Sequence, residues 1–167
     1  EVAGKITSIS RERIKEELFK ILETDNSSAG LRFCKMTGLL AGIIPEMLEN
    51  EGVPQPEEYH PEGDVLEHSF QALGVADCLD FSPLTKLAVF THDVGKAEAY
   101  HHHEKEHMGG HALVGRRKAK KIASRLRLSN EESRKLKWLV ENHMRGSVLP
   151  EMRRAKQVKL IRYREEE

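Results

Sequence analysis

The sequence is poor in several residue types, and each shortage argues against a class of protein. It has only two cysteines, Cys34 and Cys78, without the Cys-x-x-Cys spacing of zinc and redox motifs, so we expect both to be buried packing residues. The longest apolar stretch, residues 38–45, is far too short to span a bilayer, and no basic-then-apolar leader opens the chain. We therefore expect no membrane association and a location in the reducing cytoplasm.

Aromatic residues are also scarce, at 5% of the chain, whereas 32% of the residues are charged and 38% are hydrophobic. This balance is typical of an exposed, all-helical protein and not of a β-sandwich. No alternating strand pattern is visible in the sequence. A length of 167 residues fits one domain, or one domain with a small adjoining module.

Apolar periodicity and capping residues predict a series of helices. We expect a helix after the N-cap Ser10 that breaks at 25–28, two helical turns within 30–46 interrupted at Gly38, helices opening at Asp64 and at Ser82, a helix at 111–128 with Leu113 on its inner face, another from Ser129 to His143, and a last one from Pro150. Residues 97–110 are expected to form a histidine-rich connection.

The stretch 50–61 contains three prolines and several acids, which is typical of a linker. We therefore predict a helical module at 1–50, a linker at 51–63 and a second helical domain at 64–167.

Charge is distributed unevenly, although the formal net charge is zero. Residues 116–164 contain 17 Lys and Arg and four acids, a net charge of +13, so the remainder carries −13. Such asymmetry is a feature of surfaces that meet polyanions, and it is equally consistent with long basic side chains that only solvate helices. Trp138 and Tyr163 are the only aromatic residues in the basic stretch, which argues against an RNA-recognition module built on aromatic stacking.

One short run carries most of the chemical information. His92 and Asp93 are adjacent near a predicted helix end, and His68 lies 24 residues upstream in its own amphipathic segment. Imidazole and carboxylate together suit a divalent cation such as Mn²⁺, Ni²⁺, Co²⁺, Fe²⁺, Zn²⁺ or Mg²⁺. Neighbouring residues on a regular helix project about 100° apart. His92 and Asp93 can therefore share an ion only where the helix ends or kinks, and we expect Gly95 to supply that freedom.

We assign an expected role to each candidate residue of this site. We predict His68, His92 and Asp93 as metal ligands, with Asp93 also taking part in catalysis. Lys96 would hold a phosphate oxygen, and His111 and His143 would bind phosphate, bind a second ion, or protonate the leaving group. His103 and His107 are weaker candidates, because we expect 101–107 to form an exposed loop over the mouth of the site.

The order of these residues resembles a known family. His68, then His92-Asp93-Val94-Gly95-Lys96, then His111 and His143 is similar to the HD superfamily of metal-dependent phosphohydrolases over residues 64–145. The resemblance implies an all-α, HD-domain helical bundle preceded here by a small helical module, and hydrolysis of phosphate esters with a divalent metal ion.

A narrower resemblance covers most of the chain. Ile9–Leu18, Gly38-Leu39-Leu40 with Pro45-Glu46, and Leu126–Glu131 are similar to the C-terminal half of bacterial tRNA nucleotidyltransferases and poly(A) polymerases. In that family a polymerising domain precedes an RNA-binding helical segment and an HD domain. The glycine-serine motif and paired aspartates of the polymerising domain do not occur in this sequence.

One feature departs from the family pattern. The HD pattern ends with a late aspartate ligand, but this sequence has no Asp after Asp93. The spacing of Glu141 and Glu151 gives no support for either as a substitute. Because the chain also opens with Glu1, we expect a piece of a longer protein in which that aspartate lies beyond Glu167.

Two functions of different class follow from these patterns. The first is a phosphohydrolase acting on nucleotide or RNA-terminal phosphates, with 2′,3′-cyclic phosphates among those the resemblance implies. The second is a catalytically idle HD-fold module that binds tRNA through the basic 116–164 segment for a separate polymerising domain. Salt-sensitive contacts from Arg116, Arg117, Lys118, Lys120 and Lys121 would serve that binding.

Overall fold

The computed structural model describes residues 3–55, 63–102, 109–146 and 148–161, and these residues form helices and no strand. The α-helices are α1 (Arg11–Glu23), α2 (Ser27–Met36), α3 (Leu40–Ile43), α4 (Pro45–Leu48), α5 (Val65–Asp77), α6 (Pro83–Thr91), α7 (Lys96–His102), α8 (His111–Arg125), α9 (Asn130–Asn142) and α10 (Arg154–Ile161). Three 3₁₀ turns are η1 (Ala3–Ser8), η2 (His143–Arg145) and η3 (Leu149–Glu151). The predicted all-α fold is confirmed.

Short polar side chains start the main helices, as the sequence predicts. Ser10, Asp64, Ser82 and Ser129 each accept a hydrogen bond from the backbone N–H three residues later, which satisfies one of the free donors of the first turn. Glu132 completes a reciprocal capping box with Ser129. Local sequence therefore fixes the start of α1, α5, α6 and α9.

Some predicted boundaries are wrong. The predicted break after the first helix is confirmed, because α1 ends at Glu23, but it is shorter than 25–28 because α2 already begins at Ser27. Within 30–46 the helix α3 ends at Ile43, and Pro45 opens the separate short helix α4, which suits proline because the first helical turn needs no N–H at that position. The predicted connection 97–110 begins with helix α7, and residues 103–107, including His103 and His107, lie outside the described residues. The last helix begins at Arg154 and not at Pro150.

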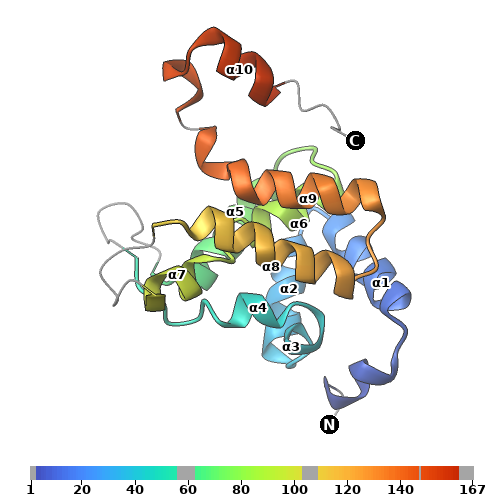
Figure 1. Ribbon diagram of the computed structural model, residues 1–167. Helices are drawn as coiled ribbons and strands as arrows, with labels where there is room; N and C mark the ends of the chain where they lie inside the picture. The colour runs from blue at the N-terminus through green and yellow to red at the C-terminus, as the bar shows by residue number, and fades with distance from the viewer. Residues whose placement is uncertain (1–2, 56–62, 103–108, 147, 162–167) are drawn as a thin grey trace.

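A large hydrophobic core joins the N-terminal helices to the later ones. Leu18, Leu22 and Leu31 belong to the same buried cluster as Phe70, Phe90 and further residues up to Val140. Figure 1 shows α8 and α9 side by side across the bundle, whereas α10 stands apart at the C-terminal end. Two expected core residues are wrong: Leu113 is 67% exposed and Cys78 lies at the surface, while Cys34 is buried as predicted.

Ion pairs also join the first 50 residues to the rest. Lys15 binds Glu132 at 2.7 Å, Arg32 binds Glu67 at 2.6 Å, and Arg125 binds Glu46 at 2.6 Å. The Glu46 side chain is only 7% exposed, so this last pair is largely buried. The predicted division into 1–50, 51–63 and 64–167 stays a prediction, but the parts on either side of the proposed linker share one core. Within the described residues, no helix is long and apolar enough to cross a bilayer.

Candidate metal centre

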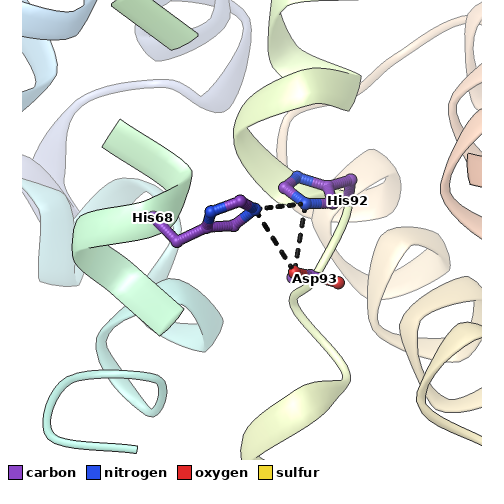
Figure 2. A group of neighbouring side chains, drawn as sticks. All are labelled: His68, His92 and Asp93. Carbon is purple, nitrogen blue, oxygen red and sulfur yellow. Dashed lines mark hydrogen bonds and ion pairs between the residues drawn. The ribbon is translucent and has the colours of Figure 1, made fainter. Parts of the chain in front are cut away.

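The ends of two neighbouring helices bring the predicted metal ligands together. His68 lies in the first turns of α5, and α6 packs against α5 and ends at Thr91, so that His92 and Asp93 follow in a turn. Figure 2 shows His68 reaching across from α5 toward His92 and Asp93. His68 Nε2 lies 3.2 Å from His92 Nε2 and 3.8 Å from Asp93 Oδ2, and His92 Nε2 lies 3.0 Å from Asp93 Oδ2.

The other oxygen of Asp93 faces a second pair of histidines. His111, the first residue of α8, places Nε2 3.5 Å from Asp93 Oδ1, and His143, just after α9, places Nε2 3.3 Å from it. The two Nε2 atoms are 3.2 Å apart. The ligand atoms of each trio lie within 4.8 Å of one another, so each trio is spaced to hold a cation. The one carboxylate of Asp93 is therefore shared by two candidate cation sites.

The hydrogen bonds of two histidines identify which ring nitrogen carries the proton. His92 Nδ1 lies 2.7 Å from the Val89 carbonyl oxygen, and His143 Nδ1 lies 2.8 Å from the Val140 carbonyl oxygen. A carbonyl oxygen only accepts hydrogen bonds, so each Nδ1 donates and each neutral ring keeps a lone pair on Nε2. Both lone pairs point toward the oxygens of Asp93. Acceptor atoms this close need a proton or a metal cation between them.

Asp93 is an ionised group in an almost closed environment. Its side chain is 2% exposed, and Oδ1 has no hydrogen-bond partner within the described part of the chain. Burial raises the pKa of Asp93, but contacts with His143 and His92 and the charges of His92 and Lys96 lower it by more, so the net pKa lies far below its usual range. Burial lowers the pKa of His92, yet the contact with Asp93 raises it by more. Both shifts show that the site favours positive charge beside the Asp93 carboxylate.

Lys96 and Gln55 complete the wall around Asp93. Lys96 Nζ donates to Asp93 Oδ2 at 2.7 Å and to Gln55 Oε1 at 2.6 Å, and the lysine side chain is only 10% exposed. Lys96 therefore contacts the carboxylate directly, whereas its predicted contact with a phosphate oxygen stays a prediction. Gln55 Nε2 is buried and has no partner within the described residues, so an unused donor lies beside the centre.

Gly95 serves the centre in a different way from the one expected. Its φ is not in the left-handed region, so backbone freedom is not the reason for glycine here. A Cβ at this position would lie 2.1 Å from the His111 carbonyl oxygen and 2.5 Å from the Gly115 nitrogen. Glycine is needed because the turn after α6 packs directly against the backbone of α8. That contact brings His111 within reach of Asp93.

The donor set fits a divalent metal ion. Neutral imidazole nitrogens and a carboxylate oxygen are borderline and hard ligands, which suit Mn²⁺, Ni²⁺, Co²⁺, Fe²⁺ and Zn²⁺. Each trio supplies three protein ligands, which leaves coordination positions for water or substrate, as catalytic metal sites require. Among the described residues, Glu141 is not one of the grouped candidate ligands, and it forms an ion pair with Arg116 at 2.9 Å.

The structure thus brings together all six predicted site residues: His68, His92, Asp93, Lys96, His111 and His143. Sequence reasoning missed Gln55 and the two valine carbonyls that orient the rings. A signal for the carbonyls does exist in the sequence. Val-x-x-His occurs as Val89–His92 and as Val140–His143, each at the end of a helix, where a carbonyl three residues back is free to accept.

The basic stretch is partly neutralised within the fold. Arg116 pairs with Glu141, Arg117 pairs with Glu98, and Lys118 is 4% exposed and pairs with Glu49. Lys120 and Lys121 are exposed on α8. Of the five cations proposed for RNA contact, Lys118 is therefore wrong as a surface contact, because its side chain is buried.

Two known protein families match this chain, one in its N-terminal part and one in the rest. A family described as the HD domain matches residues 65–164, and one described as the probable RNA and SrmB-binding site of polymerase A matches residues 1–50. The multifunctional CCA protein of Halorhodospira halophila is 34% identical over 129 residues, covering 75% of this chain and 30% of that protein.

Two further relatives carry the same name. The multifunctional CCA protein of Alcanivorax borkumensis is 28% identical over 160 residues, 96% of this chain and 39% of that protein. The one of Alkalilimnicola ehrlichii is 37% identical over 94 residues, 56% of this chain and 23% of that protein. The chain spans less than half the length of each of these relatives. The matched family and the histidine–aspartate centre agree, and the chain belongs to the HD domain family.

Proposed function

We propose that this chain is a metal-dependent phosphohydrolase module that acts on nucleotide or RNA-terminal phosphates within a larger tRNA nucleotidyltransferase-like protein. The observation that carries the proposal is the position of Asp93. Each of its two oxygens faces one pair of imidazole nitrogens. The Val89 carbonyl orients His92 and the Val140 carbonyl orients His143, so that one Nε2 lone pair in each pair points toward the carboxylate. This arrangement is suited to hold divalent cations, and phosphoester hydrolysis can use such ions.

The chemistry divides between the bound ions and the residues of the chain. A divalent ion, when bound, polarises the phosphoryl oxygen and acidifies water. Asp93 lies between the two histidine pairs and contacts both. Lys96 lies where its positive charge favours an anionic phosphoester next to the carboxylate. His111 and His143 stand opposite His68 and His92 across Asp93, so they are placed either to hold the second ion or to pass a proton to the leaving oxygen.

Hydrolysis of bis(p-nitrophenyl) phosphate by protein loaded with Mn²⁺, Co²⁺ or Ni²⁺ tests this function. We expect turnover by the native sequence and none by Asp93→Asn, which keeps the shape of the side chain and removes its charge. Asp80→Asn is the matched control, because Asp80 is exposed and lies outside the centre. Native protein that contains no transition metal by elemental analysis and stays inactive with each added ion would contradict the proposal.

A second function has its own support and can coexist with the first. Residues 1–50 match a family described as a probable RNA-binding site, and Lys120 and Lys121 are exposed on α8. These observations favour an HD-fold module that binds tRNA whether or not it turns over. We expect the tRNA affinity of the native chain to fall with salt concentration, and the double variant Lys120→Glu with Lys121→Glu to lower the log–log slope by about 2. An affinity independent of salt would remove this function.

A further inference from the structure

A hollow of about 350 Å³ opens beside the metal centre, between α5, α6 and α9. Three of the candidate ligands, His68, His92 and His143, form one wall of it. The other lining residues are small or aliphatic: Ala72, Thr85, Ala88, Val89 and Leu139. The hollow is therefore continuous with the place where a phosphoester would meet the two histidine pairs.

The lining has little capacity to form hydrogen bonds away from the histidines. Among the described lining residues, Thr85 is the only other polar one, and its hydroxyl lies 2.9 Å from the Ser82 hydroxyl. None of the lining side chains that the structure describes outside the centre carries a charge. A ligand in this hollow is consequently held by apolar contact with Val89 and Leu139, which are both only partly buried by the fold.

We propose that this hollow holds the nucleobase of a nucleoside phosphate whose phosphoryl group lies at the metal centre. The inference rests on the proposed hydrolase function and names its substrate class. A nucleobase is a flat ring with two apolar faces, which suits a shallow aliphatic hollow. The ribose would link this base to a phosphoryl group on the other side of the lining histidines. Because the Thr85 hydroxyl is the one polar group outside the histidines that the described lining offers to a base edge, the hollow accepts purines and pyrimidines alike.

Kinetics with paired substrates test the proposal. Adenosine and uridine 2′,3′-cyclic monophosphates are compared with glycerol 1,2-cyclic phosphate, which has the same five-membered cyclic ester and no base. We expect kcat/KM for each nucleotide to exceed that for the base-free ester at least about tenfold, and to differ between the two nucleotides by less than that factor. Equal values for nucleotide and base-free ester would overturn the proposal and leave the hydrolase function intact. A tenfold or larger difference between adenosine and uridine would overturn the prediction of base tolerance.

A filling substitution locates the effect. Ala72→Leu places a larger side chain in the hollow from a half-buried position of α5, where leucine suits a helix. We expect it to reduce the ratio of nucleotide to base-free kcat/KM at least about fivefold. Ala29→Leu is the matched control, because Ala29 is an exposed residue of α2 outside the hollow, and its ratio should equal that of the native chain. An unchanged ratio in Ala72→Leu would contradict the assignment.

Equilibrium binding separates the failure of this inference from the failure of the function. Adenosine 3′-monophosphate and inorganic phosphate are titrated into Mn²⁺-loaded protein by calorimetry, which needs no turnover. Tighter binding of the nucleotide, reduced in Ala72→Leu and unchanged in Ala29→Leu, supports the hollow even if no substrate is hydrolysed. Equal affinity of nucleotide and phosphate overturns it even if hydrolysis is observed.

Discussion

Replacing His111 with glutamine should remove one of two bound metal ions and leave the other. The candidate ligands form two trios that share only Asp93, one with His68 and His92 and one with His111 and His143. His111→Gln and His68→Gln therefore each disrupt one trio. Asp93→Asn disrupts both, because the same carboxylate faces each pair of imidazoles.

The size of the effect on stability follows from mass action. An ion that binds only the folded state at one hundred times its Kd stabilises the protein by ~2.7 kcal/mol. For a chain of 150–250 residues, each kcal/mol shifts Tm by roughly 2–4 °C. Each Mn²⁺ at that concentration should thus raise Tm by about 5–11 °C. The native chain should gain up to twice that amount, since two ions beside one carboxylate repel each other and the second binds more weakly.

Elemental analysis after gel filtration and thermal melts across a Mn²⁺ series measure the two quantities. We expect two equivalents of Mn²⁺ in the native chain, one in His111→Gln and in His68→Gln, and fewer than one in Asp93→Asn. Two equivalents in His111→Gln would show that its imidazole is not a ligand. Retention of both ions by Asp93→Asn would refute the shared carboxylate and the reasoning built on it.

Three further changes test other parts of the fold. Arg125→Ala should lower the free energy of unfolding in urea by about 2–3 kcal/mol, because it leaves the carboxylate of Glu46, 7% exposed, without its partner. Gly95→Ala should cost about 3 kcal/mol in the same assay and reduce bound Mn²⁺, because its Cβ would meet backbone atoms of α8 at 2.1 and 2.5 Å. Burial raises the pKa of Asp77, but hydrogen bonds from Ser27, Ser28 and Lys86 lower it by more. A lowered folded pKa stabilises the protein above the unfolded value of about 3.9, so Asp77→Asn should be less stable than the native chain above about pH 5. That difference should shrink in acid melts as the pH falls through the folded pKa, and a constant difference would contradict the assignment.

Much of this arrangement could be predicted from local sequence, because local rules govern it. Ser10, Asp64, Ser82 and Ser129 start helices through their own hydrogen bonds, and these starts agree with the structure. The grouping of His68 and His92 with Asp93 could be expected from residue types, and that of His111 and His143 from the resemblance to the HD superfamily. The helix starts depend on hydrogen bonds within a few residues, and the grouping of the ligands depends on residue types that suit a divalent cation.

The incorrect predictions concern packing between distant segments. The role of Gly95 depends on the backbone of α8, which lies beyond it in sequence, and no local pattern contains that contact. Lys118 occurs in a run of basic residues, yet it is buried because Glu49 meets it from the N-terminal part of the chain. The sequence therefore shows that a glycine or a run of basic residues is present, but contacts between distant segments determine whether each residue is buried or exposed.

The charges of the centre explain why a phosphoester is a fitting ligand for it. Among the described residues, Asp93 supplies the only carboxylate of the grouped ligands, the four imidazoles would bind metal in their neutral form, and Lys96 adds a positive charge. With divalent ions bound, one carboxylate leaves the centre strongly positive in a poorly hydrated environment. An anionic substrate would reduce this excess positive charge, whereas a neutral ester would not. A carboxylate added at the centre would lessen this excess charge, so an engineered acid at the position of Gln55 should strengthen metal binding and weaken binding of inorganic phosphate.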